Sequence, residues 1–370
     1  MKEITLYVKE DFSYLAEPLE GEKEIFLVYD ANVEWAAAEV ERVLDSLGSG
    51  DSAAAGAGGR SAFRGSLAIC ATESAKTMDT VVSICRFLMA GGADRGALVL
   101  ALGGGVTTDM AGFAASIYKR GVRFATLPTT LLSQVDAGIG GKTGVNLDGY
   151  KNILGRIQQP EFIYTASCTL KTLPEAEFRS GLAEMLKTFI IDDAPHYRRA
   201  MTVLGRGGSG RPCGALTANP ADLTELVRAA AQIKCGVVER DEFETGERRV
   251  LNLGHTVGHA IEWWQAGGAA AARYSHGEAV AVGIIQAARV SEALGVCHKG
   301  LAAQLEADFE ALGLPTQCPV SPETMERAVR QDKKADGDSV HFVLIRNLGR
   351  VEVRLLPVSQ IINLLSTANI

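Results

Sequence analysis

Ala97-Leu98-Val99-Leu100-Ala101-Leu102 runs directly into Gly103-Gly104-Gly105-Val106-Thr107-Thr108-Asp109. The apolar run predicts a buried strand, and the segment after the glycines predicts a helix. Glycines between a strand and a helix let phosphate approach the backbone, where N–H groups at the helix start face it. Because the spacing is not G-x-G-x-x-G, a tight turn without a ligand stays open as an alternative.

Similar segments surround this one. Glu24–Asp30, Ser66–Cys70 and Val122–Thr126 each predict a short buried strand, and helical or polar segments follow them. This alternation predicts an α/β domain over residues 1–173, Rossmann-like, with a mostly parallel sheet and helices on both faces. The polar loop Leu127–Thr130 leaves a strand next to the glycine turn, which indicates a ligand crevice at the strand ends. The small, polar residues of Leu47–Gly65 predict a loop.

Beyond Pro174 the strand signals almost stop. Long amphipathic patterns predict an all-helical domain over residues 174–370. Its helices are expected at Glu175–Ile191, Pro220–Glu239, Leu253–Trp264 and Gly277–Leu294, with breaks at Gly205–Gly214 and Ala266–Ala272. The one late strand signal is a hairpin of Val340–Ile345 with Arg350–Leu355.

Composition excludes several classes of protein. A chain of 370 residues favours two domains, and a net charge of −7 argues against a nucleic-acid partner. No apolar run reaches the roughly 18 residues of a membrane span, and the N-terminus lacks the apolar stretch of a signal peptide. The seven cysteines include no C-x-x-C pair, so we expect reduced core thiols in a cytoplasmic protein.

Two histidines, His255 and His259, stand four residues apart, so a helix would present both on one face. With His276 and Glu184 they suffice to hold a divalent metal with one position open. Either both ligate the ion, or one ligates while the other transfers protons. Thr256 replaces the glutamate of H-E-x-x-H, which excludes that type of metalloprotease. The polar or edge contexts of the remaining histidines, His196, His298 and His341, predict no catalytic role.

A polar cluster lies between residues 119 and 152. It comprises Lys119, Arg120, Asp136, Lys142, Asn146, Lys151 and Asn152. A solvated surface loop is one interpretation. We favour a cationic pocket for a phosphorylated substrate, because glycines and apolar residues separate the lysines. The Walker A pattern fails, since Asp136 occupies the place of its first glycine.

Taken together, these motifs closely resemble the 3-dehydroquinate synthase family. The resemblance covers roughly residues 24–355 and is carried by separated motifs in order. They are Gly103–Phe113, Arg120-Gly121, Leu127–Leu132, Asp136, Gly140–Lys142, Asn146, Lys151-Asn152, Leu170–Lys187, Lys234, Arg248–Glu262, His276–Val280 and Asp332–Lys334. The resemblance implies an NAD-binding α/β domain followed by a helical metal-binding domain, with the active site in the cleft and a homodimer as the assembly.

The resemblance also implies roles for individual residues. The ligands of Zn²⁺ (or Co²⁺) would be Glu184, His255 and His276, which leaves His259 as an acid or base. Further catalytic contacts are implied for Asp136, Lys142 and Asn252. NAD would contact Asp30, Asn32, Glu73, Lys76, Gly104, Gly105, Asp109, Thr129, Thr130 and Thr172. Substrate would contact Lys151, Asn152, Lys187, Lys234, Arg248, Arg120 from across the dimer interface, and one of Lys333 and Lys334.

The family converts 3-deoxy-D-arabino-heptulosonate 7-phosphate to 3-dehydroquinate and phosphate, a step of the shikimate pathway. The implied reaction is a transient oxidation by NAD, phosphate elimination, re-reduction and an intramolecular aldol closure. The chain departs from the family at Thr107-Thr108, where a hydroxyl would crowd the pyrophosphate or donate to it, and at the insert Ala266–Ala272.

Three alternatives stay open. Sugar-phosphate cyclases of the 2-epi-5-epi-valiolone or 2-deoxy-scyllo-inosose synthase type share the NAD and metal motifs, but their substrates lack the carboxylate that Lys234 and Arg248 would bind. A polyol dehydrogenase of the glycerol dehydrogenase type needs no phosphate-binding Lys142, Lys151 and Asn152. A metal-stabilised binding protein without activity is the non-enzyme alternative.

Overall fold

The computed structural model describes residues 3–47, 62–205, 218–268, 274–331, 335–336 and 338–368. The chain forms two compact units, Met1–Thr172 and Leu173–Ile370. Each is described by itself. Among the described residues, none of the helices combines the length and the apolar character that crossing a bilayer requires.

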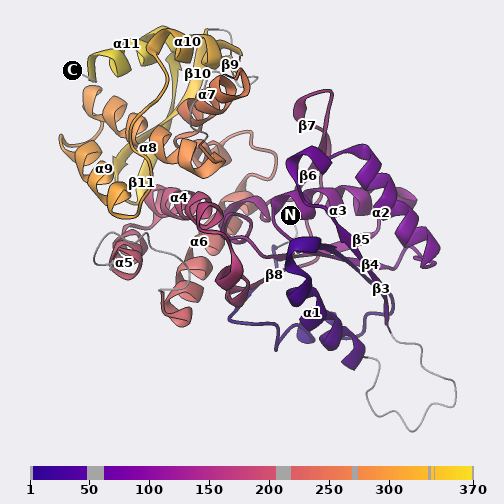
Figure 1. Ribbon diagram of the computed structural model, residues 1–370. Helices are drawn as coiled ribbons and strands as arrows, with labels where there is room; N and C mark the ends of the chain where they lie inside the picture. Colours follow the sequence, from indigo (N-terminus) through magenta and orange to yellow (C-terminus); the bar gives the residue numbers. More distant parts are fainter. Residues whose placement is uncertain are drawn as a thin grey trace, which may run out of the picture. The chain divides into compact units, whose positions relative to one another are not determined.

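The first unit is built on a six-stranded parallel sheet with the order β1-β8-β5-β4-β2-β3 (Figure 1). Its strands are β1 (Leu6–Lys9), β2 (Ile25–Asp30), β3 (Phe63–Ile69), β4 (Leu98–Gly103), β5 (Arg123–Pro128) and β8 (Ile163–Ala166). All six residues of β4 are buried, as the apolar run around Leu100 predicts for a central strand covered on both faces.

Helices cover both faces of this sheet, as Figure 1 shows for α1 (Glu34–Ser46) on one side and α2 (Met78–Ala90) and α3 (Gly105–Ile117) on the other. The alternation of side chains along β2 decides which helix each residue meets. Phe26 and Val28 pack with the residues of α2 and α3, whereas Ile25 and Leu27 pack with those of α1. The predicted doubly covered α/β fold is therefore confirmed.

A second sheet in this unit is the antiparallel hairpin of β6 (Lys142–Leu147) and β7 (Tyr150–Ile157), which packs beside α3. The periodicity of the sequence did not predict this hairpin, because glycines and lysines interrupt its apolar residues. Neither did it predict β1 or β8, which are only four residues long. The predicted loop at residues 47–65 is too long at its end, since β3 already begins at Phe63; residues 48–61 lie outside the described ranges.

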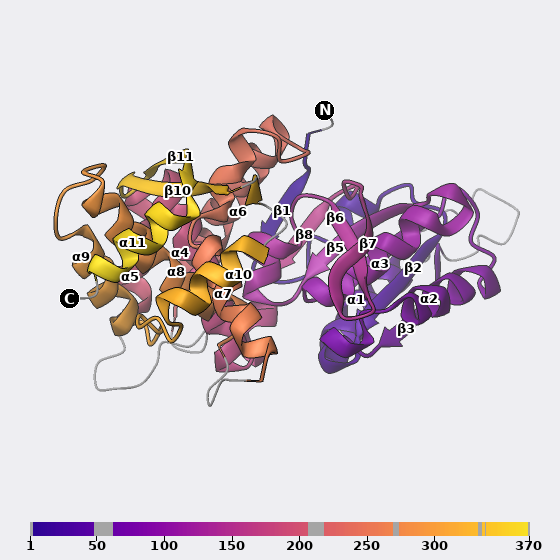
Figure 2. The same cartoon turned by 90° about the horizontal axis from the view of Figure 1, so that it is seen from above.

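The second unit is mainly helical. Its helices are α4 (Glu175–Asp192), α5 (Ala194–Leu204), α6 (Pro220–Arg240), α7 (His255–Ala266), α8 (His276–Ala293), α9 (Leu301–Ala311), α10 (Pro322–Gln331) and α11 (Val358–Ala368). The predicted hairpin is confirmed as β10 (Ser339–Asn347) and β11 (Arg350–Pro357), which pair with each other and run alongside α11 in Figure 2. The unit is thus helical apart from a small sheet of β9 (Ala335–Asp336), β10 and β11.

Local signals set the helix boundaries near the functional residues. Gly254 has a φ of 80°, so the helix expected from Leu253 begins only at His255. Ser275 and Glu278 form a capping box, which fixes the start of α8 at His276. Both candidate metal ligands of this region are consequently the first residues of their helices. Most of the predicted break at Gly205–Gly214 and part of the one at Ala266–Ala272 lie outside the described residues.

Free cysteines are spread over the described part of the chain, as the sequence predicts, but most of them are not core residues. Cys235 is buried, Cys70 is exposed, and Cys85, Cys168, Cys297 and Cys318 are intermediate. Burial nevertheless raises the pKa of Cys235 to about 12, which keeps this thiol protonated and unreactive.

Candidate active site

The predicted NAD residues all follow the carboxyl ends of strands in the parallel sheet. Asp30 ends β2, Gly104 and Gly105 follow β4, and Thr129 and Thr130 follow β5. Glu73 and Lys76 come after β3, and Thr172 ends the short helix η6 (Ser167–Thr172) after β8. Because parallel strands end at the same edge, these residues lie along one edge of the sheet, where ligands bind in open α/β folds.

The glycine turn has no room for side chains. A Cβ on Gly104 would lie 3.0 Å from Thr130 Cγ2, and one on Gly105 would lie 3.1 Å from Ala137 Cβ. The Thr129 N–H donates to the Gly103 carbonyl over 2.9 Å, which joins the two predicted loops. Since Gly104 precedes the first helical residue and carries no side chain, the first N–H groups of α3 can receive an anion.

The two threonines that depart from the family pattern have distinct environments. Thr107 is fully buried beneath Gly103, where an added Cβ would lie 2.5 Å from its Oγ1. The hydroxyl of Thr108 donates to the Gly105 carbonyl over 3.1 Å. The Thr108 hydroxyl thus bonds the turn itself, whereas Thr107 Oγ1 is buried under the turn and has no hydrogen-bond partner among the described residues.

A hydrogen-bonded network joins residues of both predicted roles. Lys76, 4% exposed, places its Nζ 2.5 Å from Asp109 Oδ2 and 2.5 Å from Asn152 Oδ1. Asn146 donates to Glu73 Oε1 over 2.8 Å and accepts from the backbone N–H of Asn152 over 2.8 Å. The β6–β7 hairpin is thereby tied to the residues after β3 and at the start of α3. Burial raises the pKa of Asp109 to about 6, although Lys76 acts to lower it.

A cavity of about 320 Å³ adjoins this network. Its walls include Asp109 together with Lys142 and Asn152, two of the residues predicted to meet a phosphorylated substrate. Lys151 is exposed on the same hairpin. The interpretation of residues 119–152 as a pocket gains support from this cavity, whereas the exposed turn of the hairpin at 147–150 fits the surface interpretation.

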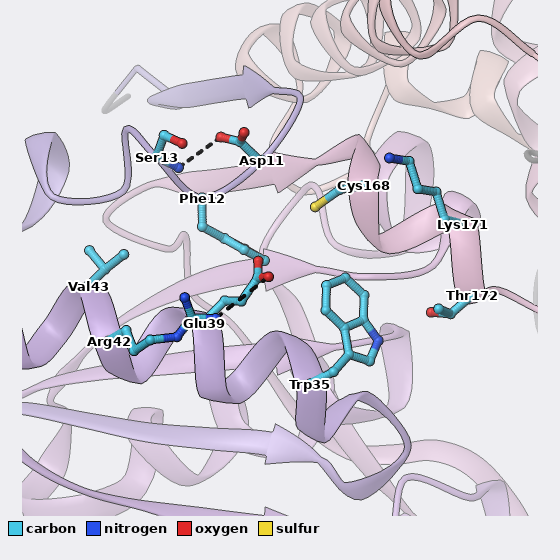
Figure 3. Close-up of a pocket in the computed structure, with 10 residues that line it drawn as sticks. All are labelled: Asp11, Phe12, Ser13, Trp35, Glu39, Arg42, Val43, Cys168, Lys171 and Thr172. Carbon is cyan, nitrogen blue, oxygen red and sulfur yellow. Dashed lines mark hydrogen bonds and ion pairs between the residues drawn. The ribbon is translucent and has the colours of Figure 1, made fainter.

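A second cavity of the first unit, of about 570 Å³, lies beside α1 and is shown in Figure 3. Trp35 and Arg42 project into it from α1, facing Asp11 from the loop after β1 and Cys168 and Thr172 from η6. The indole Nε1 of Trp35 is buried and has no hydrogen-bond partner among the described residues. One predicted NAD residue, Thr172, therefore lines a different cavity from Asp109.

In the second unit, Glu184, His255 and His276 converge. Each offers one ligand atom, and these atoms all lie within 4.8 Å of one another. His255 Nε2 is 3.9 Å and His276 Nε2 is 3.5 Å from Glu184 Oε1. The ring of His259 lies close by, with its centroid 5.3 Å from that of His255.

Neighbouring acceptors fix which nitrogen each ring presents. His255 Nδ1 is 3.2 Å from the Leu253 carbonyl, and His276 Nδ1 is 3.5 Å from Glu262 Oε2. In a neutral ring, a nitrogen held in this way by a carbonyl or a carboxylate keeps the proton, so both Nε2 atoms would be the ones to ligate a metal ion. Glu262, seven residues after His255 on α7, was missed by the sequence reasoning. Its helical spacing of 255, 259 and 262 is a signal that identifies it.

The electrostatics of this cluster match a cation site. Glu184 is fully buried; burial acts to raise its pKa, but Lys187 Nζ at 2.5 Å and the two imidazoles hold the pKa well below its usual value. Burial and Lys187 lower the pKa of His255, so its ring is neutral. Burial acts to lower the pKa of His276 as well, but hydrogen bonds to Glu184 and Glu262 raise it to about 10. An ionised carboxylate with imidazole nitrogens is a donor set that suits Zn²⁺, so the residues present fit the metal that the sequence implies.

A cavity of about 340 Å³ opens beside the cluster. His255, His259 and Asn252 line it, and so do Glu244, Arg249 and His341. Asn252 Nδ2 donates to Glu244 Oε1 over 2.7 Å, which holds a carboxylate in this cavity. His341 comes to this cavity from far along the chain, on β10, and the expectation that it has no catalytic role stays a prediction. Glu244 and Arg249 were also missed, although Arg249 lies within the Arg248–Glu262 motif and Glu244 lies four residues before it.

The remaining predicted residues have varied environments. Lys187 and Lys234 are 1% and 6% exposed, and Arg248, 3% exposed, donates from Nη1 to the Glu242 carbonyl over 2.6 Å. Asp136 lies in the π-helical turn η5 (Ser133–Ala137). Arg120 is exposed with a φ of 70°. Lys333 and Lys334 lie outside the described residues. The individual roles of all these side chains stay predictions.

Two family models match the chain consecutively: 3-dehydroquinate synthase N-terminal over residues 66–180, and 3-dehydroquinate synthase C-terminal over residues 181–335. The 3-dehydroquinate synthase of Acidithiobacillus ferrooxidans is 41% identical over 285 residues, which is 77% of this chain and 75% of that protein.

Solved structures share the whole architecture. A 2-epi-5-epi-valiolone synthase from Streptomyces hygroscopicus subsp. jinggangensis, with NAD⁺ and Zn²⁺ bound, has a TM-score of 0.82 at 26% identity, covering 100% of this chain and 97% of that one. A 2-deoxy-scyllo-inosose synthase complexed with carbaglucose-6-phosphate, NAD⁺ and Co²⁺ has a TM-score of 0.79 at 23% identity, with 98% of each chain covered. This second likeness shows the fold alone.

Proposed function

Because the chain belongs to the 3-dehydroquinate synthase family, we propose that it converts 3-deoxy-D-arabino-heptulosonate 7-phosphate to 3-dehydroquinate and inorganic phosphate. The observation that carries the proposal is the buried group of Glu184, His255 and His276, which unites an ionised carboxylate with two oriented imidazoles beside a cavity. When bound, Zn²⁺ or Co²⁺ would polarise a substrate hydroxyl, and NAD would supply its reversible oxidation.

The chain's own residues supply binding and proton transfer. His259 lines the cavity beside the metal ligands, and an imidazole there can take a proton from the substrate or return one. Glu244 offers a second base, held by Asn252. These two groups are the candidates for removing the C–H proton that precedes phosphate loss.

Cations and amides of the first unit are proposed to take the phosphate and the cofactor. Lys142 and Asn152 line one cavity with Asp109, and Lys76 connects Asp109 to Asn152. The N–H groups at the start of α3 can hold the pyrophosphate of NAD. Loss of the phosphate by elimination would make the enzyme a carbon–oxygen lyase.

We extend the proposal to a cytoplasmic homodimer in which Arg120 serves the partner's site. Lys119 and Arg120 both have left-handed backbone angles, with φ of 48° and 70°. Such angles are costly for residues with side chains and are retained where position matters. Light scattering should give twice the chain mass of 39.2 kDa, and a monomer would remove this part of the proposal.

The activity is tested with purified protein, NAD and zinc. Phosphate should be released from the heptulosonate phosphate without net accumulation of NADH. An absence of phosphate release would refute the proposal. NADH accumulation on glycerol would instead identify a polyol dehydrogenase.

A carboxylate-free cyclase is the second candidate, favoured by the likeness to the valiolone synthase over the whole chain. The presence of Lys234 and Arg248, the two buried cations that the family resemblance assigns to the substrate carboxylate, weighs against it. If the enzyme turned over the matching sugar phosphate without a carboxylate faster than the heptulosonate phosphate, this candidate would be the correct one.

A further inference from the structure

Two neighbouring arginines of η7 (Glu247–Asn252) have different surroundings. Arg248 is 3% exposed and donates to a backbone carbonyl, whereas Arg249 is partly exposed and lines the cavity beside the metal ligands. The sequence-based interpretation assigns substrate binding to Arg248 alone. Arg249 is the residue whose guanidinium reaches the wall that His259 and Asn252 share.

Arg249 is held in place by His341. Its Nη1 lies 3.0 Å from His341 Nε2. A guanidinium can only donate, so His341 Nε2 must accept and its proton resides on Nδ1. The imidazole therefore orients Arg249 without neutralising its charge. Among the described residues, no carboxylate lies within ion-pair distance of Arg249.

Glu244 lines the same cavity, but its carboxylate accepts from Asn252 and lies beyond ion-pair distance of Arg249, so the charge of Arg249 can pair with an anion of the substrate. The planar fork of a guanidinium matches the two oxygens of a carboxylate or a phosphate. The substrate of the proposed reaction carries one of each, and His259 in the same wall is expected to act on that substrate. We propose that Arg249, positioned by His341, is a further substrate-binding residue that pairs with an oxyanion of the substrate. The inference rests on the proposed function.

The test compares Arg249→Gln, Arg249→Lys, His341→Leu and His341→Gln with the wild type, all loaded with NAD and zinc. A hydrogen-bonded ion pair of this kind corresponds to about 10- to 100-fold in affinity. Arg249→Gln should raise the KM by that factor and leave kcat nearly unchanged, while Arg249→Lys should recover part of the loss. His341→Leu should raise the KM less than Arg249→Gln, and His341→Gln, which keeps an acceptor at similar reach, should restore it.

Arg354→Gln is the matched control, because this exposed arginine of β11 pairs with Glu352. It should leave the KM unchanged. An Arg249→Gln enzyme with a wild-type KM would overturn the inference, as would equal effects of His341→Leu and His341→Gln on the KM. A fall in thermal stability with an unchanged KM would show that the pair serves only to anchor β10.

Calorimetric titration identifies the oxyanion. The two probes are the heptulosonate without its phosphate and the sugar phosphate without its carboxylate. Wild type and Arg249→Gln should differ in affinity for the probe that retains the group Arg249 binds. They should have equal affinity for the probe that lacks this group. If the wild type turns over no substrate, the proposed function fails, and these titrations still decide whether Arg249 binds an anion. Equal affinities of wild type and Arg249→Gln for both probes would refute that binding.

Discussion

Replacement of Gly283 by alanine should damage the metal site from a distance. Gly283 lies in the middle of α8, where a Cβ would lie 1.9 Å from the backbone oxygen of Gly254, the residue before His255. Real Cβ contacts are essentially never below 3.0 Å, so the helix and the turn must separate by about 1.1 Å or more. The obstacle is backbone, which cannot rotate away as a side chain does.

That displacement exceeds what a metal site tolerates. Ligand distances are held to about 0.2 Å, so moving the turn of His255 away from α8, which begins with His276, should weaken Zn²⁺ binding roughly 10- to 100-fold. Overpacking of this kind costs about 1–3 kcal/mol. For a unit of this size the Tm should fall by about 2–12 °C.

The assay combines zinc affinity, from competition with a chelating dye, with thermal unfolding. Gly236→Ala is the control: it is also a helical glycine of the second unit, but its Cβ would meet only the movable end of Arg240 at 3.1 Å. Its zinc affinity should stay at the wild-type value, and alanine should favour the helix by about 0.5–1 kcal/mol. A Gly283→Ala protein with lowered Tm but wild-type zinc affinity would refute the idea that this contact positions His255.

Three further outcomes are expected. His276→Ala should lose bound metal, whereas His259→Ala should keep it and lose about 10²–10⁴-fold in rate, as measured by metal analysis and phosphate release; equal metal retention would contradict the ligand assignment. Glu262→Gln should weaken zinc affinity about 10- to 100-fold without unfolding the protein, because Glu262 orients His276, and unchanged affinity would count against that role. The raised pKa of Asp109, about 6, means that the folded state binds this proton more tightly than the unfolded state. The stability of the wild type relative to Asp109→Asn should therefore fall as the pH rises from about 3.8 to about 6 and then level off. A difference in Tm between the two proteins that does not change between about pH 4 and pH 7 would contradict this.

Much of the fold was predictable because its strongest signals are local. The continuous apolar runs of β4 and β2 predict strands covered on both faces, and the long amphipathic patterns after Pro174 predict packed helices. The β6–β7 hairpin was not predictable in the same way. Most residues of β7 are exposed, so it lacks an apolar face that periodicity can detect. Hydrogen bonds to distant residues hold it in place instead: Asn146 donates to Glu73, and Asn152 accepts from Lys76.

The residues of the candidate site likewise fall into two groups, those that the sequence identifies and those that only the fold brings to the site. Residues of a spaced motif, such as His255 and His259, can be recognised from the sequence because one helix fixes their relation. His341 could not be, since it comes to the cavity through the packing of β10 more than 80 positions later. Arg249 could not be identified for a different reason. The sequence does not show which of two adjacent arginines faces the cavity, because this depends on the course of η7.

The separation of His255 from His259 has a physical origin in the start of α7. A histidine at the first helical position lies next to the turn, where its Nδ1 reaches the Leu253 carbonyl two residues earlier. This contact holds His255 with its Nε2 3.9 Å from Glu184 Oε1, while His259, one turn later on α7, lines the cavity. This difference in surroundings supports the proposal that His255 binds the metal and His259 transfers protons.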